Sequence, residues 1–448
     1  MLAGAIHIAL TTAIFLTGHF QLLPGTFDEN GIGLTFSLDG TIYRTLASGM
    51  ATELQTNGFL AWLAVKSPLH ARLYSLSFAI FGKLLGHNIL AAEPLNLFYY
   101  LGIVSCVYML GREAFNARAG LLAAYIVGAW PSFLLHSTQV IRDPLAILSF
   151  LGLMVVLTFL LTREFTWLNA IAKGFLSAML VTVFWMTRGN MWNVVLVAII
   201  VGLAMLVQRM IREKKLLAGN IIVMLWIIAA ALLVPTRLES STLAGVKPPA
   251  TALAIPSSLQ PLPPEGIWNR VVQQIANRRA GFRSSTSHAS DIDGDVRFSG
   301  AGDIVRFIPR AFVIGFFAPF PSMWVRPGNF GLMVRLLSGF ETLAMYFLYF
   351  AAGYCVWQEK RNMKMWLLFL VATIGMVGLG LVVVNAGALY RIRYVFWMMM
   401  IVIASRSLHR LAHKLNEVAN ILLTRIERRH QPHFRNLFVP NVEKVFLL

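Results

Sequence analysis

Long apolar runs separated by short polar connections dominate the sequence. A helix needs about 20 apolar residues to cross the roughly 30 Å of hydrocarbon in a bilayer. About ten runs of that length fall at 2–22, 94–111, 118–135, 144–162, 168–186, 190–208, 216–235, 333–357, 364–384 and 392–409. The pattern therefore predicts an all-α polytopic membrane protein with about 10 transmembrane helices, in a range of roughly 9 to 12.

Two further apolar stretches are interrupted by charge or proline. The stretch 69–86 contains His70, Arg72 and Lys83, and the stretch 303–325 contains prolines and flanking arginines. Both patterns favour amphipathic helices in the membrane interface, within the first and second long outer loops. The alternative, that either stretch crosses the bilayer, stays open at this point.

The composition supports the membrane assignment and limits the functional classes. The chain has 448 residues, of which 57% are hydrophobic and 13% are charged, against roughly 25% charged residues in soluble domains. The formal net charge of +18 would suggest a nucleic-acid partner in a soluble protein. In a membrane protein the excess fits cytoplasmic loops that follow the positive-inside rule. We therefore expect no nucleic-acid partner.

Clusters of Lys and Arg predict the orientation of the chain. They lie in the connections 112–117, 163–167, 209–215 and 358–363, whereas the short opposite connections carry single arginines. With the clusters inside, both termini lie in the cytoplasm of a multi-pass protein of the bacterial inner membrane. The N-terminal run lacks a charged n-region and a cleavage site, so we expect a retained span and not a signal peptide.

This topology divides the chain into four parts. They are an N-terminal transmembrane module at 1–235 that includes an outer loop at 23–93, a long outer loop at 236–332, C-terminal transmembrane helices at 333–409 and a basic cytoplasmic tail at 410–448. The long loop begins with a Pro-rich stretch, which is typical of an extended spacer. We expect this loop to cover the outer face and to select acceptors.

The segment SLDGTIYRTLA in the first outer loop places Asp39 and Tyr43 four residues apart, on one face of a helix. An aspartate there is a candidate general base towards an acceptor hydroxyl or amine. The alternative is a helix cap, because Asp39 precedes an apolar-periodic helix. Polar groups also recur at the outer ends of later spans, so we expect distant segments to form one site.

Cationic side chains at the same face are candidates to bind phosphate, because arginine binds phosphate in a bidentate manner. The candidates are Lys66, Arg142, Arg188, Arg391 and Arg393. The last two enter a span together, with Tyr390 and Tyr394 beside them. The alternative is that these side chains extend to lipid headgroups.

Three motifs occur in order in the first half of the chain. They are Asp39, Tyr43 and Ala47 at helical spacing, then SPLHARLYSLSFAIFG, then YMLGREAFNARAGLLAA, with Asp143 following in TQVIRDPLA. This ordered set, within about residues 1–190, resembles the GT-C superfamily of integral-membrane glycosyltransferases, in particular its protein-mannosyltransferase and aminoarabinose-transferase branch. Those relatives carry a second acid directly after the first, where this chain has Gly40, so Glu29 or Asp28 is a candidate substitute.

The resemblance implies an enzyme that takes a sugar from a polyprenyl-phosphate or diphosphate carrier at the periplasmic or extracellular face. The acceptor would be a glycan, a lipid or a protein. Asp39, Asp143 and Glu29 would be the catalytic residues, with Asp39 as the base or as the group that orients the acceptor. The substrate-binding residues would be Tyr43, Arg44, Lys66, His136, Arg142, Arg188, Arg391, Arg393 and Tyr394.

Some signals leave alternatives open. A divalent cation such as Mg²⁺ or Mn²⁺ is a candidate cofactor, and the motif DIDGD at 291–295 is either a cation site or an acidic surface turn. Glu341 lies about two turns into a span, where it would pair with an outer cation such as Arg335 or serve the site. Membrane lipids are expected partners in every case.

Two other functions compete with sugar transfer from a monophosphate carrier. An O-antigen-type polymerase or ligase would use the arginines of 270–283 together with Arg391 and Arg393 against lipid-linked diphosphates, without carboxylate chemistry. A transporter of lipid-linked sugars would show matching halves and charges near the bilayer midplane. The sequence shows neither of these two features.

Overall fold

Helices account for the secondary structure of the part of the chain that is described, apart from an isolated bridge between Asp291 and Asn385. The computed structural model describes residues 2–23, 34, 38–238, 266–283, 291–325 and 332–429. The Pro-rich stretch of the long outer loop, Asp28 and Glu29 lie outside these residues. The expectation of an all-α polytopic membrane protein is confirmed.

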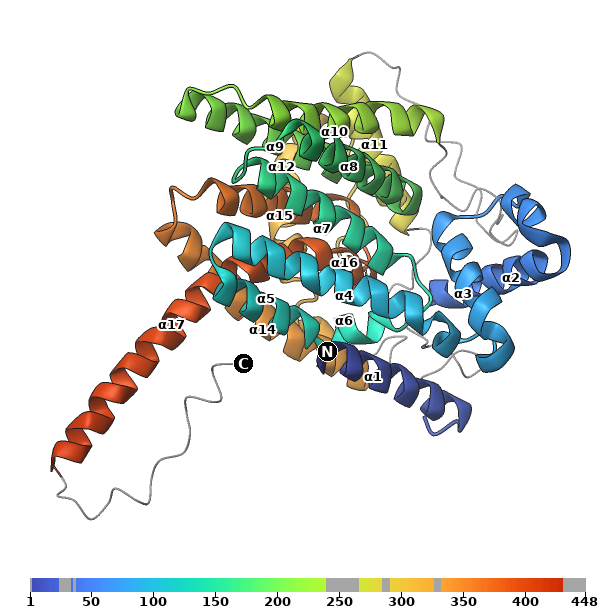
Figure 1. Cartoon of the computed structure of the whole chain (residues 1–448), viewed down its shortest axis with the longest axis horizontal. Helices are drawn as coiled ribbons and strands as arrows, with labels where there is room; N and C mark the ends of the chain where they lie inside the picture. Colours follow the sequence, from blue (N-terminus) through green and yellow to red (C-terminus); the bar gives the residue numbers. More distant parts are fainter. Residues whose placement is uncertain are drawn as a thin grey trace.

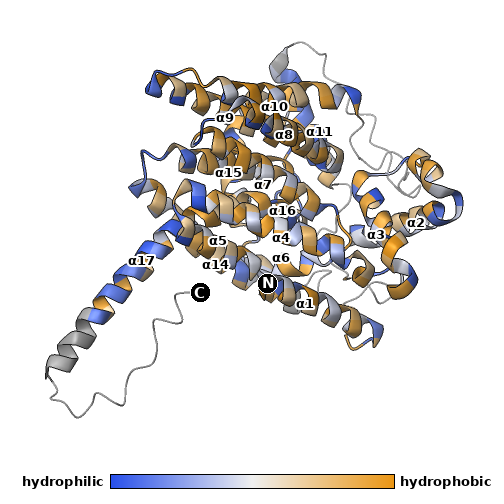
Figure 2. Cartoon of the chain, in the orientation of Figure 1, coloured by the Kyte–Doolittle hydropathy of each residue, from blue (hydrophilic) through white to orange (hydrophobic). Residues whose placement is uncertain are grey.

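Long apolar helices form a bundle in which they run side by side (Figure 1). They are α1 (Leu2–His19), α4 (Ile89–Ala114), α7 (Asp143–Leu160), α8 (Trp167–Arg188), α9 (Trp192–Glu213), α10 (Ala218–Arg237), α14 (Leu332–Gln358), α15 (Met363–Val382) and α17 (Tyr394–Arg429). A bent pair, α5 (Ala117–Gly128) and α6 (Pro131–Ser137), joins them. Hydrophobic residues cover the helices of the bundle, whereas the coloured part of α17 that extends beyond the bundle is mainly hydrophilic (Figure 2).

Among the described residues, eight helical stretches are long and apolar enough to cross a membrane, or nine if the bent pair counts as one span. The stretch Trp167–Glu213 counts once in that total although it contains α8 and α9. Arg188 at the end of α8 contacts Asp143 at the start of α7, whereas Arg209 near the end of α9 donates to the Leu160 carbonyl, 2.8 Å away, at the other end of α7. Helices α8 and α9 therefore run in opposite directions and are two spans. With the bent pair as one span and α8 and α9 counted separately, the described residues contain the ten spans that the sequence predicts.

Helix α7 lies in the centre of the bundle because it is apolar on every side. Its spanning segment is 89% buried, the highest value among the candidate spans. A helix that is hydrophobic all round is expected to be enclosed by other helices. Its first residue, Asp143, is the exception, and this carboxylate lies at the end of the bundle where α2 and α3 are found.

The two interfacial stretches predicted from the sequence form α3 (Leu69–Leu85) and α12 (Ala301–Phe317), and neither qualifies as a candidate span. Helix α2 (Leu38–Ala64) packs on α3, and the two lie together at one end of the bundle (Figure 1). Helix α12 packs along α15 at two glycines. A Cβ atom on Gly315 would lie 2.1 Å from the Met376 carbonyl oxygen, and one on Gly380 would lie 2.0 Å from that of Ala311.

The break between α5 and α6 occurs at Trp130 and Pro131, and the two helices are bent by 67°. Pro131 suits the first turn of a helix, because its missing amide hydrogen has no partner there. At the end of α5, the Gly128 carbonyl lacks a continuing helix but accepts a hydrogen bond from the Tyr100 hydroxyl at 2.6 Å. The bend brings Ser132 of α6 within hydrogen-bonding distance of Tyr390 of α16 (Ala386–Ile392) and of Tyr394 of α17.

The described part of the second outer loop is tied to the corner between α15 and α16. Arg279 of α11 (Ile267–Arg283) donates to the carbonyls of Asp293 at 2.6 Å and Leu381 at 2.9 Å. The Ile292 amide donates to the Val384 carbonyl at 2.7 Å. The short helix α13 (Pro321–Trp324) then leads towards α14. At the other end of the chain, α17 continues without a break past residue 409 into the predicted tail.

Candidate functional site

Two acids and two arginines from four distant segments form one ion-paired chain. Arg391 Nη2 lies 2.8 Å from Asp39 Oδ2, and Arg391 Nε lies 3.0 Å from Asp143 Oδ2. The other carboxylate oxygen of Asp143 pairs with Arg188 Nη2. The sequence predicted that these groups meet at one end of the bundle, and the structure brings them together.

Each of the four charged residues occupies the helix end that favours its charge. Asp39 lies in the first turn of α2 and Asp143 in the first turn of α7. Arg188 lies in the last turn of α8 and Arg391 in the last turn of α16. Helix amino termini stabilise anions and carboxyl termini stabilise cations. The four helix dipoles therefore support the same arrangement as the ion pairs.

Exposure separates the roles of the two acids. The Asp143 side chain keeps 7% of its surface exposed and lies between two guanidinium groups, whereas the Asp39 side chain keeps 41% exposed. Removal of one partner from a buried ion pair lowers the stability of the folded protein by about 3–5 kcal/mol. Asp143 is therefore placed to hold Arg188 and Arg391, and Asp39 is the acid that a substrate can reach.

The loop that carries Arg142 and Asp143 is held in place by buried hydrogen bonds. The Tyr74 hydroxyl donates to Asn96 Oδ1 at 2.6 Å and lies 3.2 Å from the Ile141 carbonyl. Asn96 Nδ2 donates to the Thr138 carbonyl at 3.0 Å. A buried network in which every member has a partner restricts a loop to one conformation. Helices α3 and α4 thus position the start of α7.

The ionisation of Asp39 is set by burial and by the surrounding arginines. Partial burial works to raise the pKa of Asp39, but Arg391, Arg142 and Arg188 together hold this pKa below its usual value. The carboxylate is therefore ionised at neutral pH. Its hydrogen bond goes to Arg391, so the side chain is not occupied as a helix cap.

Among the described residues, Arg142 has no carboxylate partner. It is close enough to Asp39 to help lower the pKa of that carboxyl group. Its Nε atom is buried and has no hydrogen-bond partner among the described residues. Arg142 is thus available to an incoming anion, in contrast to Arg188 and Arg391, which bind carboxylates.

A buried histidine lies behind Tyr43. The ring of His70 on α3 contacts the Tyr43 ring edge-on, with centroids 4.3 Å apart. Only 1% of His70 is exposed, and neither ring nitrogen has a hydrogen-bond partner among the residues described. Burial, with Arg142 and Arg188 as further causes, lowers the pKa of His70 to about 3. The sequence analysis counted His70 only as an interruption of an apolar stretch.

A second buried network lies next to Arg391. Glu341 of α14 accepts a hydrogen bond from the Ser132 amide at 2.7 Å and another from the Tyr390 hydroxyl. The Tyr394 hydroxyl donates to Ser132 Oγ at 2.6 Å and lies 3.4 Å from His136 Nδ1. Tyr390 precedes Arg391 on α16, so this network positions the arginine. Of the two alternatives that the sequence left open for Glu341, the pairing with Arg335 is not the one observed, because the Ser132 amide and the Tyr390 hydroxyl bind its two oxygens.

Other predicted site residues lie outside the ion-paired chain. Arg393 is 1% exposed and donates to the carbonyls of Ala318 and Phe316, away from Asp39. Lys66 is exposed between α2 and α3, without a contact to the ion-paired chain in the described residues. Arg44 is buried one position after Tyr43. Glu29 lies outside the described residues, so its predicted role stays a prediction.

Two of the arginines that an O-antigen-type polymerase would need, Arg279 and Arg393, are held by backbone carbonyls. Arg279 is 4% exposed and binds three backbone carbonyls, and its guanidinium lies over the rings of Phe298 and Phe307. Arg393 is also held by carbonyls. The geometry therefore gives that alternative less support than it gives a carboxylate-dependent transfer.

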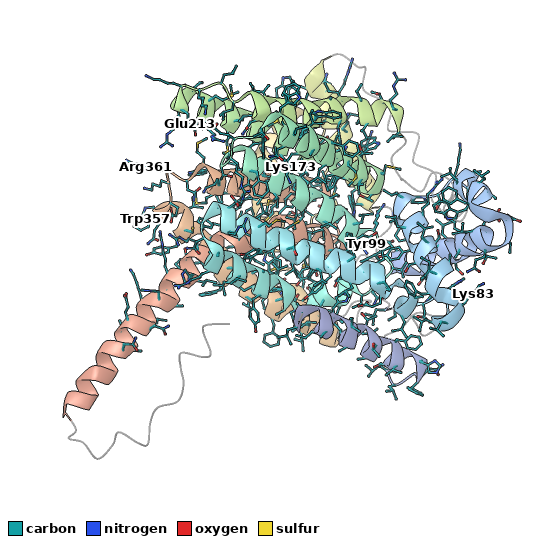
Figure 3. The ribbon with its side chains drawn as sticks, viewed as in Figure 1. Lys83, Tyr99, Lys173, Glu213, Trp357 and Arg361 are labelled. Atoms are coloured by element: carbon teal, nitrogen blue, oxygen red, sulfur yellow. The ribbon has the colours of Figure 1, made fainter. Side chains whose placement is uncertain are left out.

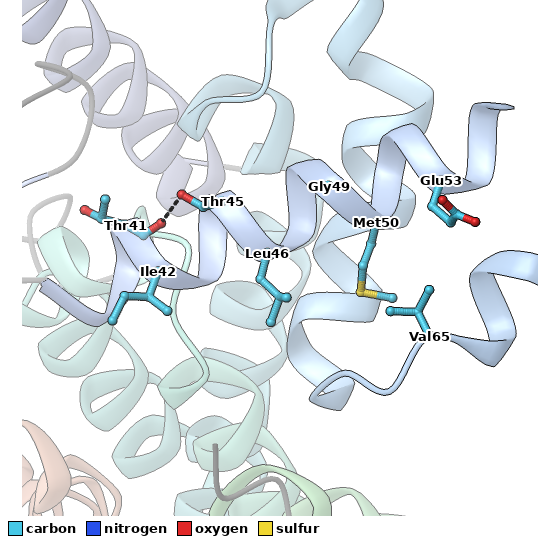
Figure 4. Close-up of a pocket in the computed structure, with 8 residues that line it drawn as sticks. All are labelled: Thr41, Ile42, Thr45, Leu46, Gly49, Met50, Glu53 and Val65. Carbon is cyan, nitrogen blue, oxygen red and sulfur yellow. Dashed lines mark hydrogen bonds between the residues drawn. The ribbon is translucent and has the colours of Figure 1, made fainter. Parts of the chain in front are cut away.

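A mainly apolar groove runs along α2 next to Asp39. It has a volume of about 640 Å³ and is lined by Thr41, Ile42, Thr45, Leu46, Gly49, Met50, Glu53 and Val65. Figure 4 shows Ile42, Leu46 and Met50 on the same side of α2, with Val65, which follows the helix, near Met50. Thr41 and Ile42 lie within one helical turn of Asp39, so one end of the groove lies near the ion-paired chain.

The described residues do not provide an evident metal site. No group of three or more His, Cys, Asp or Glu side chains converges among them. A divalent cation at Asp39 or Asp143 would have to replace the guanidinium groups that bind these carboxylates. In the DIDGD motif, Asp293 pairs with Arg310 through both carboxylate oxygens, at 2.7 and 3.0 Å. We derive no step through a metal from this donor set.

Comparison with known proteins gives one match. A family model described as oligosaccharyl transferase STT3, N-terminal, matches residues 98–260. No curated protein and no solved structure matches the chain. The matched region is a little over a third of the chain and includes Arg142, Asp143 and Arg188. Over this region the chain is similar to a membrane glycosyltransferase of the GT-C type.

Proposed function

We propose that this protein transfers a sugar from a polyprenyl-phosphate carrier to an acceptor at the membrane face where Asp39 lies, which by charge distribution is the non-cytoplasmic face. The observation that carries the proposal is the ion-paired chain of Asp39, Arg391, Asp143 and Arg188. It places an exposed carboxylate, several guanidinium groups and an apolar groove within one small region.

The groove and the arginines would bind different parts of the donor. The apolar side chains of α2 suit the prenyl tail, and the groove ends beside the charged groups. Arg142 and Arg391 suit the phosphate, because a guanidinium presents a planar fork of donors to phosphate oxygens. The negative charge that develops on the phosphate as the bond to the sugar breaks is stabilised by these cations, which are in place before the reaction.

Asp39 acts on the acceptor. The acceptor hydroxyl or amine attacks the anomeric carbon, its proton passes to the Asp39 carboxylate, and the bond from the anomeric carbon to the phosphate oxygen breaks. The electron pair of that bond leaves with the carrier phosphate. One attack on the face opposite the phosphate inverts the configuration at the anomeric carbon.

The ion pair to Arg391 makes Asp39 a weak base before substrate binds, because the arginine holds its pKa low. A donor phosphate that engages Arg391 removes part of this stabilisation, while the burial that raises the pKa remains. Asp39 then becomes a stronger base when the donor is in place. The arrangement couples proton transfer to donor binding and limits wasteful chemistry on water.

The experiment that tests the proposal compares Asp39→Asn with Asp295→Asn in proteoliposomes supplied with a panel of polyprenyl-phosphate sugars. We expect Asp39→Asn to reduce release of polyprenyl phosphate by about 10²–10⁴-fold, the usual range for a lost general base. Asp295 is an exposed aspartate of the second outer loop and is a matched control. Full activity of Asp39→Asn would contradict a role for this carboxylate in the transfer.

A binding measurement separates donor recognition from chemistry. Polyprenyl phosphate without a sugar is the probe, and its effect on the melting temperature of the purified protein reports binding. We expect Arg142→Gln to weaken this binding about tenfold or more, whereas Asp39→Asn leaves it intact. Unchanged binding by Arg142→Gln would remove the ground for placing the phosphate at this arginine.

A further inference from the structure

A basic crevice lies at the end of the bundle opposite Asp39. It has a volume of about 570 Å³ and is lined by Met205, Gln208 and Arg212 of α9, by Lys360 and Arg361 before α15, and by Met363, Trp366 and Leu370 of α15. Figure 3 shows Arg361, Trp357 and Glu213 at this end, away from Lys83 of α3. The crevice is therefore separate from the candidate active site.

Two helix faces of equal spacing form the walls of the crevice. Lining residues on α9 occur at 205, 208 and 212, and those on α15 at 363, 366 and 370. Steps of three and four residues place side chains on one face of a helix. Helices α9 and α15 pack against each other, so the crevice is the opening between them where they reach the membrane surface.

Three cations at the mouth of the crevice have no carboxylate partner among the described residues. They are Arg212, Lys360 and Arg361, and only Lys360 has a further contact, with the ring of Trp357. Neighbouring cations at the same end are paired: Arg209 with Glu213, Lys215 with Glu164, Arg163 with Glu113, and both Arg406 and Arg410 with Glu359. Among the described residues, Arg212, Lys360 and Arg361 are thus three cations without a carboxylate partner that line a single crevice, whereas other unpaired cations at this end, such as Arg118 and Lys214, lie outside its lining.

The chemistry of the lining changes with depth. Arg212, Lys360 and Arg361 lie near the helix ends, whereas Met205 and Leu370 lie about two turns further along α9 and α15. A free phosphate ion would use the mouth alone, whereas a phospholipid would use both parts. Basic pockets between transmembrane helices at the cytoplasmic side bind acidic lipid headgroups in this manner.

We propose that this crevice binds one anionic phospholipid. Its phosphate contacts Arg212, Lys360 and Arg361, and one acyl chain lies along Met205 and Leu370 between α9 and α15. The site is distinct from the donor groove on α2, and it does not depend on the proposed sugar transfer.

The test compares two variants of the full chain that lose the same net charge. Arg212→Gln, Lys360→Gln and Arg361→Gln are combined in the crevice variant. The matched control combines Arg118→Gln, Lys214→Gln and Lys414→Gln, three exposed cations outside the crevice lining. Native mass spectrometry measures the binding of phosphatidylglycerol, with phosphatidylcholine as the neutral lipid and inorganic phosphate as the headgroup alone.

We expect the crevice variant to bind phosphatidylglycerol at least about tenfold more weakly than the wild type, and the control variant to bind within about twofold of it. Equal losses in both variants would mean that only net charge matters and would overturn the proposal. Inorganic phosphate that competes fully with the lipid at equal concentration would overturn the role of the apolar interior.

Photo-crosslinking locates the acyl chain independently of charge. A phosphatidylglycerol with a diazirine in one acyl chain is irradiated with the wild-type protein, and crosslinked peptides are mapped. We expect crosslinks within 205–212 and 363–370. Crosslinks spread evenly over the lipid-facing helices would show that no chain occupies the crevice and would overturn the proposal.

Discussion

Arg391 and Asp39 form an ion pair of 2.8 Å although 352 positions separate them in the chain. The pair joins the first turn of α2 to the last turn of α16, next to the final span. Arg391 also pairs with Asp143, so this residue from the C-terminal part of the chain bridges the two carboxylates of the site. Everything proposed for the exposed carboxylate depends on this contact.

Removal of Arg391 should change the pH profile of the reaction. Arg391 lowers the pKa of Asp39, whereas burial raises it. In Arg391→Gln the effect of burial remains, so the pKa of Asp39 rises and the carboxylate is protonated at a higher pH. We expect the acid limb of kcat/KM for the residual activity to move to higher pH than in the wild type. A profile of initial rates between pH 3.5 and 8 checks this.

The control for that profile is Arg310→Gln, which breaks an arginine–aspartate pair with Asp293 elsewhere on the second outer loop. Its acid limb should coincide with that of the wild type. An unshifted limb in Arg391→Gln would mean that the ionisation of Asp39 does not control the rate.

His70 should make stability depend on pH. Its pKa is lowered to about 3 in the folded protein, whereas an unfolded chain has a His pKa near 6.5. The unfolded state therefore binds more protons between these values, and stability falls as pH falls from about 6.5 towards about 3. One pKa unit corresponds to about 1.36 kcal/mol, so the loss between pH 6.5 and pH 5 is about 2 kcal/mol.

Melting temperatures measured in detergent at pH 6.5 and pH 5 check this dependence. His70→Leu should lose less stability over the same interval than the wild type. His19→Leu changes an exposed histidine of α1 and should behave as the wild type. Equal acid sensitivity of His70→Leu and the wild type would show that another group is responsible.

Glu341 should contribute to the stability of the fold, because it accepts hydrogen bonds from two buried groups. In Glu341→Ala the buried Ser132 amide and the Tyr390 hydroxyl lose their acceptor, and each unsatisfied buried group costs about 1–3 kcal/mol. Glu341→Gln keeps one carbonyl acceptor and should cost less. Melting temperatures check the prediction: Glu341→Ala should melt at the lower temperature and Glu341→Gln at the higher one. A more stable Glu341→Ala would contradict the network.

Two glycines of α15 offer a matched pair for testing the packing of α12. A Cβ atom on Gly380 would lie 2.0 Å from the Ala311 carbonyl oxygen, whereas a Cβ atom on Gly378 meets nothing within 4 Å. We expect Gly380→Ala to destabilise the protein by about 1–3 kcal/mol or more, the cost of overpacking. Gly378→Ala should be neutral or slightly stabilising. Similar melting temperatures for the two variants would show that α12 does not pack here.

The sequence predicted the spans well because hydrocarbon thickness and helix rise leave little freedom. The run at 144–162 became α7. The run at 118–135 was predicted as one span, and its break before Pro131 was not predicted. Interfacial helices followed from charges inside apolar stretches, as in α3. These are local signals, and each is read from about 20 consecutive residues.

The site was predicted less completely, because contacts between distant segments depend on packing. The clustering of Asp39, Asp143, Arg188 and Arg391 could be inferred from their positions at helix ends on one side of the membrane. Arg393 could not be separated from Arg391, since only the geometry of α16 turns one guanidinium to Asp39 and the other to the Ala318 carbonyl. His70 gave no signal, because burial of a polar side chain is invisible in a single sequence.

The attachment of the second outer loop has a practical consequence for chimeric proteins. Arg279 and Ile292 bind the chain at Leu381 and Val384, just before the helix that carries Arg391. If the loop alone were grafted into another protein, the Arg279 side chain and the Ile292 amide would lose the Leu381 and Val384 carbonyls as their acceptors. A chimera that tests whether this loop selects acceptors should therefore exchange residues 266–296 and 379–393 together.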